Sequence, residues 1–437
     1  MSPTLISRGL IAAAILTTIP SAVSGQEARS RWERMCEIRS EKFELVMPQA
    51  MQDNDLDMWI VVMREGLLDP MWEALGRGYV GDWAYYVFTS QGDRVERAAL
   101  GVSGYRLEQC HVYDYFGGAG ELASYVAERD PDRIGVNMAE SIGGADGLSH
   151  TSYNHLVEEL GSYGDRLVSA ERFVSDFRST RTALEIATFA QAGEISRQIA
   201  ERAFSNEVIT PGVTTLEDVA WWMSDQQLDR GLESSFDMPS VYVTGPEGIV
   251  ASSSDRIIQR GDLLMLDWGV GYLDFYTDMK RIAYVLRDDE TEAPSGIRHA
   301  FERGREVRDV MKATIRPAAS AGEALERTWV ALEAEGFNRI EFNQPTQDPA
   351  ITDVALGPHS VGNWGHGLGP SLASFNPTRM TYELRPGTLI SIELFAYTAN
   401  PDWDNAKIRV PLEDDAVITE RGVEWLYPVN NRILIIK

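Results

Sequence analysis

Apolar and polar positions alternate with a changing period along the first part of the chain, which predicts helices mixed with strands. Apolar side chains recur at helical spacing over residues 32–52, and the run Met58–Met63 is apolar at every position. Shorter patterns follow: strand-like at 83–88, 94–100 and 134–137, and helical at 121–129 and 152–160. This order predicts an α/β domain over residues 32–175, with the polar, charged stretch 173–182 as the link to a second domain.

Long helical patterns and a hairpin dominate residues 178–437, the expected second domain. Apolar spacing predicts helices at 183–206, 215–230, 296–315 and 321–335. A strand at 239–243 precedes a hairpin, which is formed by Leu263–Trp268 and a returning strand at Tyr276–Leu286. Two later strands are expected to carry Glu393 and Glu413. The whole chain is therefore expected to be α/β, with α+β character.

A carboxylate interrupts the apolar strand of this hairpin. Strand alternation places Asp267 on the same face as Leu263 and Met265, where burial of an unpaired charge is costly. Glu393 repeats the pattern between two apolar neighbours. One such residue is often a core polar group with satisfied hydrogen bonds, whereas several need a shared positive partner. Because basic residues are few in these stretches, we expect that partner to be a pair of metal ions.

Five side chains form the candidate metal centre. They are four carboxylates and one imidazole, a set suited to a pair of hard or borderline divalent ions: Asp267, Asp278, His366, Glu393 and Glu413. Glycines on both sides of His366 let the backbone approach a ligand closely. The other candidates, His111, His150 and His155, have no partner at ligand spacing and are expected to be structural or exposed.

Composition limits the partners and the compartment. The 437 residues carry a net charge of −26, and the isoelectric point is near 4.6. Such acidity argues against nucleic acid or an anionic membrane surface as partner. No segment beyond the leader is long and apolar enough to span a bilayer.

The first 25 residues have the layout of a secretory signal peptide. Arg8 precedes an apolar run to Ile19, and Pro20 is followed by small residues. The alternative is a buried N-terminal helix. Export would place the protein in the periplasm or outside the cell, where Cys36 and Cys110 are permitted to pair. The sequence leaves that pairing open.

The site motifs resemble those of the metallopeptidase family that includes methionine aminopeptidase, aminopeptidase P, prolidase and creatinase. The matching segments are Leu266–Gly269, Thr277–Arg281, Gly365–Gly369, Ile392-Glu393 and Glu413–Gly422. The resemblance is greatest to the two-domain aminopeptidase P–prolidase branch. It implies a creatinase-type N-terminal domain, a pita-bread catalytic domain and a homodimer.

The resemblance also implies a mechanism with two divalent ions. Asp278 and Glu413 would bridge the ions, Asp267 would hold one, and His366 and Glu393 would hold the other. A bridging hydroxide would attack the carbonyl of a small peptide or related amide, with Glu393 as proton acceptor. Manganese is the first choice for these mostly oxygen donors, with cobalt, iron or zinc as alternatives.

Three departures from the family pattern bear on substrate binding. Residues 249–255 lack the usual histidine, Ala373 stands where a second histidine is expected, and Pro411 replaces an arginine that is found further back, at Arg409. His359 is the candidate substitute in substrate binding. The missing hydrogen-bond donors leave two alternatives open: a metal-binding but catalytically silent homologue, or a hydrolase of non-peptide amides.

Overall fold

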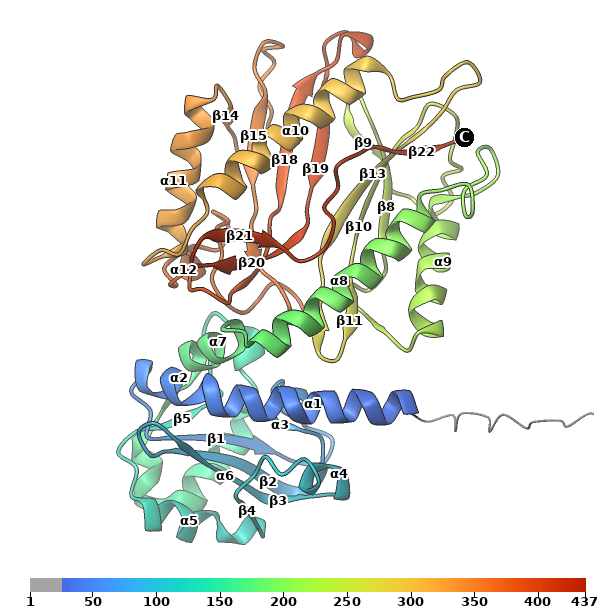
Figure 1. The fold of residues 1–437 in the computed structure, drawn as a ribbon. Helices are drawn as coiled ribbons and strands as arrows, with labels where there is room; N and C mark the ends of the chain where they lie inside the picture. Colours follow the sequence, from blue (N-terminus) through green and yellow to red (C-terminus); the bar gives the residue numbers. More distant parts are fainter. Residues whose placement is uncertain (1–25) are drawn as a thin grey trace, which may run out of the picture.

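The computed structural model describes residues 26–437, which form two successive groups of helices and strands (Figure 1). The expected signal peptide, residues 1–25, lies outside the described residues. All strands of the first group fall between Met58 and Ser169, and those of the second between Glu233 and Ile436. The mixture of helices and sheets in both groups confirms the predicted α/β class.

A six-stranded mixed sheet forms the centre of the first group. Its strand order is β4-β3-β2-β1-β5-β6, and the bounds are β1 (Met58–Met63), β2 (Tyr79–Ser90), β3 (Val95–Ser103), β4 (Tyr115–Gly117), β5 (Ile134–Val136) and β6 (Leu167–Ser169). β1 is buried at every position, and alternate side chains enter two different apolar clusters: Trp59 and Val61 in one, Ile60 and Val62 in the other. The sheet is therefore covered on both faces.

Helices cover the two faces. One face carries α1 (Gln26–Leu45), α2 (Met47–Asp53) and α7 (Glu171–Ser179), and the other carries α5 (Leu122–Arg129) and α6 (His150–Leu160). The shorter helices are α3 (Trp72–Leu75) and α4 (Tyr105–Glu108). The prediction of a polar link at 173–182 is wrong for most of its length. Phe173 and Phe177, one helical turn apart, pack on Trp59 and make α7 part of the core.

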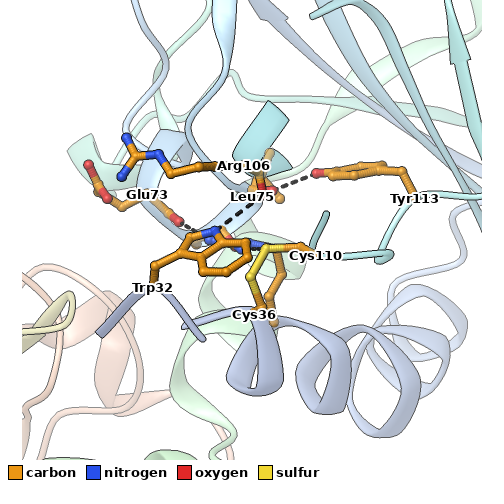
Figure 2. The surroundings of a disulfide bond; sticks show 9 residues. Trp32, Cys36, Glu73, Leu75, Arg106, Cys110 and Tyr113 are labelled. Atoms are coloured by element: carbon orange, nitrogen blue, oxygen red, sulfur yellow. Dashed lines mark hydrogen bonds between the residues drawn. A yellow bond between two sulfur atoms is a disulfide. The ribbon is translucent and has the colours of Figure 1, made fainter. Parts of the chain in front are cut away.

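A disulfide fastens α1 to the first sheet. Cys36 on α1 is bonded to Cys110, which follows α4, with 5.1 Å between their Cα atoms. Figure 2 shows the hydrogen bonds around it: Trp32 donates to the Arg106 carbonyl, and Tyr113 donates to that of Leu75. The pairing that the sequence left open is thus present in the structure.

The second group is built on a five-stranded sheet with the order β22-β13-β10-β8-β9. Its strands are β8 (Ser240–Gly245), β9 (Gly248–Ala251), β10 (Leu263–Trp268), β13 (Met279–Val285) and β22 (Leu434–Ile436). The predicted hairpin is confirmed, because β10 and β13 pair antiparallel. The sheet lies between α8 (Ala183–Ala203) with α9 (Leu216–Asp229) and α10 (Ser295–Thr314) with α11 (Ala321–Ala334). Leu263 and Met265 face the second pair of helices, as alternation predicts.

Three smaller sheets complete this half. Their strand orders are β14-β15-β18-β19, β16-β17-β20-β21 and β12-β11-β7. The bounds are β7 (Glu233–Ser234), β11 (Val270–Tyr272), β12 (Phe275–Tyr276), β14 (Asn338–Arg339), β15 (Asp353–Leu356), β16 (His359–Ser360), β17 (Leu389–Ser391), β18 (Leu394–Ala399), β19 (Lys407–Leu412), β20 (Asp415–Thr419) and β21 (Gly422–Trp425); α12 spans Pro377–Met380. Within residues 26–437, no helix combines the length and the apolar character that crossing a bilayer requires.

Three site residues lie at breaks between strands. Asp278 falls between β12 and β13, Glu393 between β17 and β18, and Glu413 between β19 and β20. The expectation that all three lie within strands is therefore wrong by one or two positions. A break releases the backbone from regular pairing, which lets the carboxylates of several sheets turn toward one place.

Candidate active site

Six titratable side chains, from two strands and four connections, meet in the second half of the chain. Asp267 is near the end of β10, His359 is on β16, and Asp278, His366, Glu393 and Glu413 lie in the connections. Three groups have one ligand atom per residue within 4.8 Å of one another: Asp278 with His359 and His366, His359 with Glu393 and Glu413, and Asp267 with Asp278 and Glu413. The structure thus brings the five predicted ligands and His359 together.

Backbone contacts between the sheets fix these positions. The Lys280 N–H donates to the Glu413 carbonyl over 3.2 Å, which joins β13 to the break that carries Glu413. His359 pairs with Ser391 between β16 and β17, and Gly357 N–H donates to the Glu393 carbonyl over 3.1 Å. A Cβ atom at Gly357 would lie 2.4 Å from Glu393 Oε2. Glycine is required there for the carboxylate to reach the site.

Lys280 places its ammonium group among the carboxylates. Its Nζ lies 3.1 Å from Asp267 Oδ2 and 2.8 Å from Glu393 Oε1, and it also donates to Glu413 Oε2. The lysine is 4% exposed. Burial lowers its pKa, but the surrounding carboxylates raise it well above the usual value. The expectation that positive charge is scarce here is wrong, because the β10–β13 register pairs Lys280 with Asp267.

The carboxylates differ in their readiness to ionise. Burial, with the charge of Glu413, raises the pKa of Asp278 to about 7. Burial also raises the pKa of Asp267 and of Glu393, against the opposing effect of Lys280. Burial acts the same way on Glu413, but the charges and hydrogen bonds of Lys280 and His359 hold its pKa below the ordinary range. The cluster as a whole needs positive charge beyond that of Lys280 to keep every carboxylate ionised.

His359 lies inside the carboxylate cluster. Its Nε2 is 3.5 Å from Glu413 Oε1 and 3.9 Å from Asp278 Oδ2. Burial lowers its pKa, but the hydrogen bond and charge of Glu413 raise the pKa to about 9. This position is as suited to an ion ligand as to the substrate-binding role that the sequence predicts, and either role remains a prediction.

His366 is more accessible than His359. Its side chain is 55% exposed, and Nε2 lies 3.6 Å from Asp278 Oδ2. The two imidazole rings meet edge to face with 4.6 Å between centroids. Arg379 supports the glycine-flanked loop by donating to the carbonyls of His366 and Gly369. The loop is thereby held with one imidazole toward the cluster and open to solvent.

A layer of charged residues behind the site was not predicted as functional. Asp415 accepts a hydrogen bond from the Asp278 N–H over 3.2 Å and another from the Tyr427 hydroxyl over 3.0 Å. Buried Asp414 pairs with Arg281 at 2.9 Å. Their adjacency to Glu413 and Lys280 in the sequence was the available signal, since neighbours on a strand alternate between two faces.

An aromatic cavity opens onto the cluster. Its volume is about 520 Å³, and the lining includes His359, His366, Glu393 and three phenylalanines: Phe342, Phe375 and Phe395. Phe342 meets Phe375 and Phe395 edge to face, with centroids 5.6 Å and 5.3 Å apart. The cavity is large enough for a small ligand and combines an apolar wall with a charged floor.

The arginine and alanine that depart from the family motifs lie outside the charged floor. Arg409 packs over the Phe395 ring at 4.3 Å and donates to the Tyr242 hydroxyl at 3.3 Å. Ala373 is fully buried. Neither residue supplies a hydrogen-bond donor to the cluster in the described structure.

Unpaired oxygens show where the residues fit a divalent cation. Asp267 Oδ1 and Asp278 Oδ1 are buried and have no hydrogen-bond partner among residues 26–437. With the two imidazoles beside Asp278, they offer the mixed oxygen and nitrogen donors that divalent ions take. Asp267 Oδ2, Glu393 Oε1 and Glu413 Oε2 are already paired with Lys280. The donors that Lys280 leaves free therefore fit one cation.

The chain is similar to proteins of known class. The profile of metallopeptidase family M24 matches residues 187–420, more than half of the chain. An uncharacterized peptidase of Bacillus subtilis, YqhT, is 25% identical over 290 residues, which are 63% of this chain and 68% of that protein. A Xaa-Pro dipeptidase of Pyrococcus furiosus is 24% identical over 272 residues, 60% of this chain and 66% of the relative.

Solved structures agree with these matches in fold. The X-Pro aminopeptidase of Thermotoga maritima has a TM-score of 0.65 and 16% identity, and the match covers 89% of this chain and 99% of that one. The Xaa-Pro dipeptidase of Bacillus anthracis has a TM-score of 0.60 and 19% identity, with 93% and 99% covered. These likenesses confirm the predicted fold class, a creatinase-like domain followed by a pita-bread domain, and the M24 match confirms the resemblance drawn from the motifs.

Proposed function

Because the chain belongs to metallopeptidase family M24, we propose that it hydrolyses a small peptide, as an aminopeptidase P- or prolidase-type enzyme with a divalent cation at the six-residue cluster. Family membership confirms the predicted enzyme class, a metal-dependent hydrolase. A bound cation would polarise the substrate carbonyl and lower the pKa of water. Manganese remains the first candidate, with cobalt, iron and zinc as alternatives.

The observation that carries this proposal is the convergence of the cluster on the floor of the aromatic cavity. Glu393, His359 and His366 line the cavity, so these are the site groups that a bound peptide would meet. Burial raises the pKa of Glu393 above its ordinary value, against the opposing charge of Lys280, and a raised pKa makes a carboxylate a better proton acceptor.

The phenylalanine wall favours an apolar side chain or a proline ring next to the scissile bond. Phe375 is exposed and Phe342 and Phe395 pack against it or each other, so the wall offers flat apolar area without hydrogen-bond donors. Xaa-Pro peptides are therefore the first substrates to try, as the names of the relatives also suggest.

A panel of Xaa-Pro and non-proline dipeptides, assayed after loading with each of the four metals, tests the proposal. We expect hydrolysis by the wild type and a loss of roughly 100-fold or more in Glu393→Gln, in line with the usual contribution of a general base. Hydrolysis that persists in Glu393→Gln would remove Glu393 from the mechanism. No hydrolysis of any peptide would contradict the proposed function.

One observation favours the alternatives of a silent homologue or a non-peptide amidase. Three of the carboxylates are paired with Lys280, and the sequence has no histidine at residues 249–255 or at position 373, where the motifs of the family lead one to expect them. If the protein binds a cation but hydrolyses no peptide, a screen of small amides separates these two alternatives. Hydrolysis of an amide supports the amidase, and no hydrolysis supports the silent homologue.

We further propose that the protein is exported, to the periplasm or the medium. The signal-peptide layout of residues 1–25 and the Cys36–Cys110 disulfide both support an oxidising destination. N-terminal sequencing of the mature protein tests this, since cleavage is expected between residues 24 and 26. A homodimer is also proposed, and light scattering of the mature protein measures it.

A further inference from the structure

We propose that the ammonium group of Lys280 takes the place of one of the two divalent ions, so that the folded chain binds no more than one ion at this site. The lysine would then act as a built-in cation that cannot dissociate. This role rests on the cation site of the proposed function, but it concerns ion number and does not require turnover.

The contacts of Lys280 overlap with both predicted ion positions. The residues around Nζ are Asp267, expected to hold one ion, Glu393, expected to hold the other, and Glu413, expected to bridge them. Ion–oxygen bonds are about 2.0–2.2 Å long for zinc and of similar length for related ions. An ion bonded to these three oxygens would therefore fill the volume that the ammonium group occupies.

Charge balance leads to the same conclusion. The carboxylates of Asp267, Asp278, Glu393 and Glu413 carry four negative charges when ionised, which two divalent ions would already neutralise. Lys280 would add a further positive charge to that arrangement. Like charges a few ångströms apart in a buried site repel one another strongly. One divalent ion together with Lys280 leaves no excess positive charge.

The fold holds Lys280 in this position. The residue lies on β13, opposite Asp267, and its backbone N–H is bonded to the Glu413 carbonyl. The Phe395 ring lies 5.6 Å from Nζ, and the side chain is 5% exposed. An ion that displaced the ammonium group would separate it from its three carboxylate partners. The buried ammonium group would then face the Phe395 ring without those partners, which is costly.

The opposite side of Glu413 remains available for one ion. Glu413 Oε2 faces Lys280, whereas Oε1 faces His359 at 3.5 Å and accepts a hydrogen bond from Ser391 at 2.7 Å. Asp278 adjoins both His359 and His366, and it makes no ion pair with Lys280 among the described residues. Glu413 thus lies between a fixed cation and a place for an exchangeable one.

The ion content of the mature protein, with both halves of the chain present, tests the inference. Wild type and Lys280→Ala are equilibrated with excess manganese, passed through a desalting column and analysed by elemental mass spectrometry. We expect at most one ion per wild-type chain and one additional ion per chain in Lys280→Ala. Lys407→Met is the matched control, because Lys407 is paired with buried Asp353 at 2.5 Å outside the site; its ion content should equal that of the wild type.

Two results would overturn the inference: two ions per wild-type chain, or equal ion content in wild type and folded Lys280→Ala. If Lys280→Ala does not fold, Lys280→Met, which keeps most of the side-chain volume, replaces that variant. The wild-type ion content tests the inference in either case. A wild type with one ion and no peptidase activity would contradict the proposed function and support the role of Lys280. A wild type with two ions and activity would do the opposite.

Discussion

Lys280 and Asp267 are direct partners across β10 and β13, and their charged groups meet at 3.1 Å. The pair places a permanent positive charge at the centre of the residues that the sequence assigns to metal ions. Glu393 and Glu413 complete the surroundings of the same ammonium group. The hairpin therefore supplies both a candidate metal ligand and a competitor for the metal.

Replacement of Asp278 by asparagine should remove both ion binding and hydrolysis. Asp278 is common to two of the three ligand groups, and its Oδ1 has no partner among the described residues. We expect manganese affinity to fall by roughly 100-fold or more, since even residues that only orient a ligand contribute roughly 10–100-fold. Isothermal titration measures it, with exposed Asp255→Asn as the control. Full activity in Asp278→Asn would refute the assignment of Asp278.

The role of His359 can be separated from that of a substrate-binding group. Because its Nε2 lies 3.5 Å from Glu413, we expect His359→Gln to weaken manganese binding by roughly 10–100-fold. Titration with manganese and steady-state kinetics are measured together. An unchanged ion affinity with a raised KM would instead support the substrate-binding role. His155→Gln, in the first half of the chain, should change neither quantity.

Asp69 should make the stability of the first sheet depend on pH. Burial raises its pKa from 3.8 to about 6, although Met71 N–H and Asn137 donate hydrogen bonds to it. The native state therefore binds the proton more tightly than the unfolded state. The stabilisation is complete below pH 3.8 and is lost as the pH rises through about 6, a change on the order of 3 kcal/mol.

Hydrogen exchange of the β1 amides at pH 4 and pH 7 measures this effect locally. We expect the exchange free energy of the wild type to fall between these values, after correction for intrinsic exchange rates. Asp69→Asn should lose most of that difference, whereas exposed Asp93→Asn should retain it. An identical pH dependence in Asp69→Asn would show that another group is responsible.

Removal of the disulfide should destabilise the first half of the chain. The Cys36–Cys110 bond closes a sequence separation of 74 residues, and loss of a disulfide of this kind is expected to lower the unfolding free energy by roughly 2–4 kcal/mol. Thermal unfolding of Cys36→Ser/Cys110→Ser, compared with the wild type, measures the change. A reductant should lower the melting temperature of the wild type and leave that of the variant unchanged. Equal melting temperatures without reductant would contradict the prediction.

The sequence was sufficient for the elements whose pattern is local. Alternation along β10 predicted that Leu263 and Met265 share a face, and both enter one core cluster. The prediction failed at α7, where charged residues at 172, 176 and 178 concealed the apolar side of a short helix. Phe173 and Phe177 become interpretable as core residues only when the sheet that they cover is known.

At the site, the sequence did not reveal the register in which the strands pair. Both strands of the hairpin were predicted, but the pairing of Lys280 with Asp267 depends on the connection at residues 269–278, which includes the short strands β11 and β12. A shift by one residue would bring Arg281 to that position and turn Lys280 to the other face. The contacts of His359 likewise come from strand pairing far apart in the sequence.

A cation that is covalently part of the chain responds differently to its surroundings from a bound ion. Chelators, dilution and metal scarcity remove exchangeable ions, but they leave Lys280 with Asp267, Glu393 and Glu413. The strand connections that carry these carboxylates therefore keep a counter-charge when the medium contains no free metal. Under the proposed role of Lys280, the site would stay partly charge-compensated without metal and would need only a single ion to be complete.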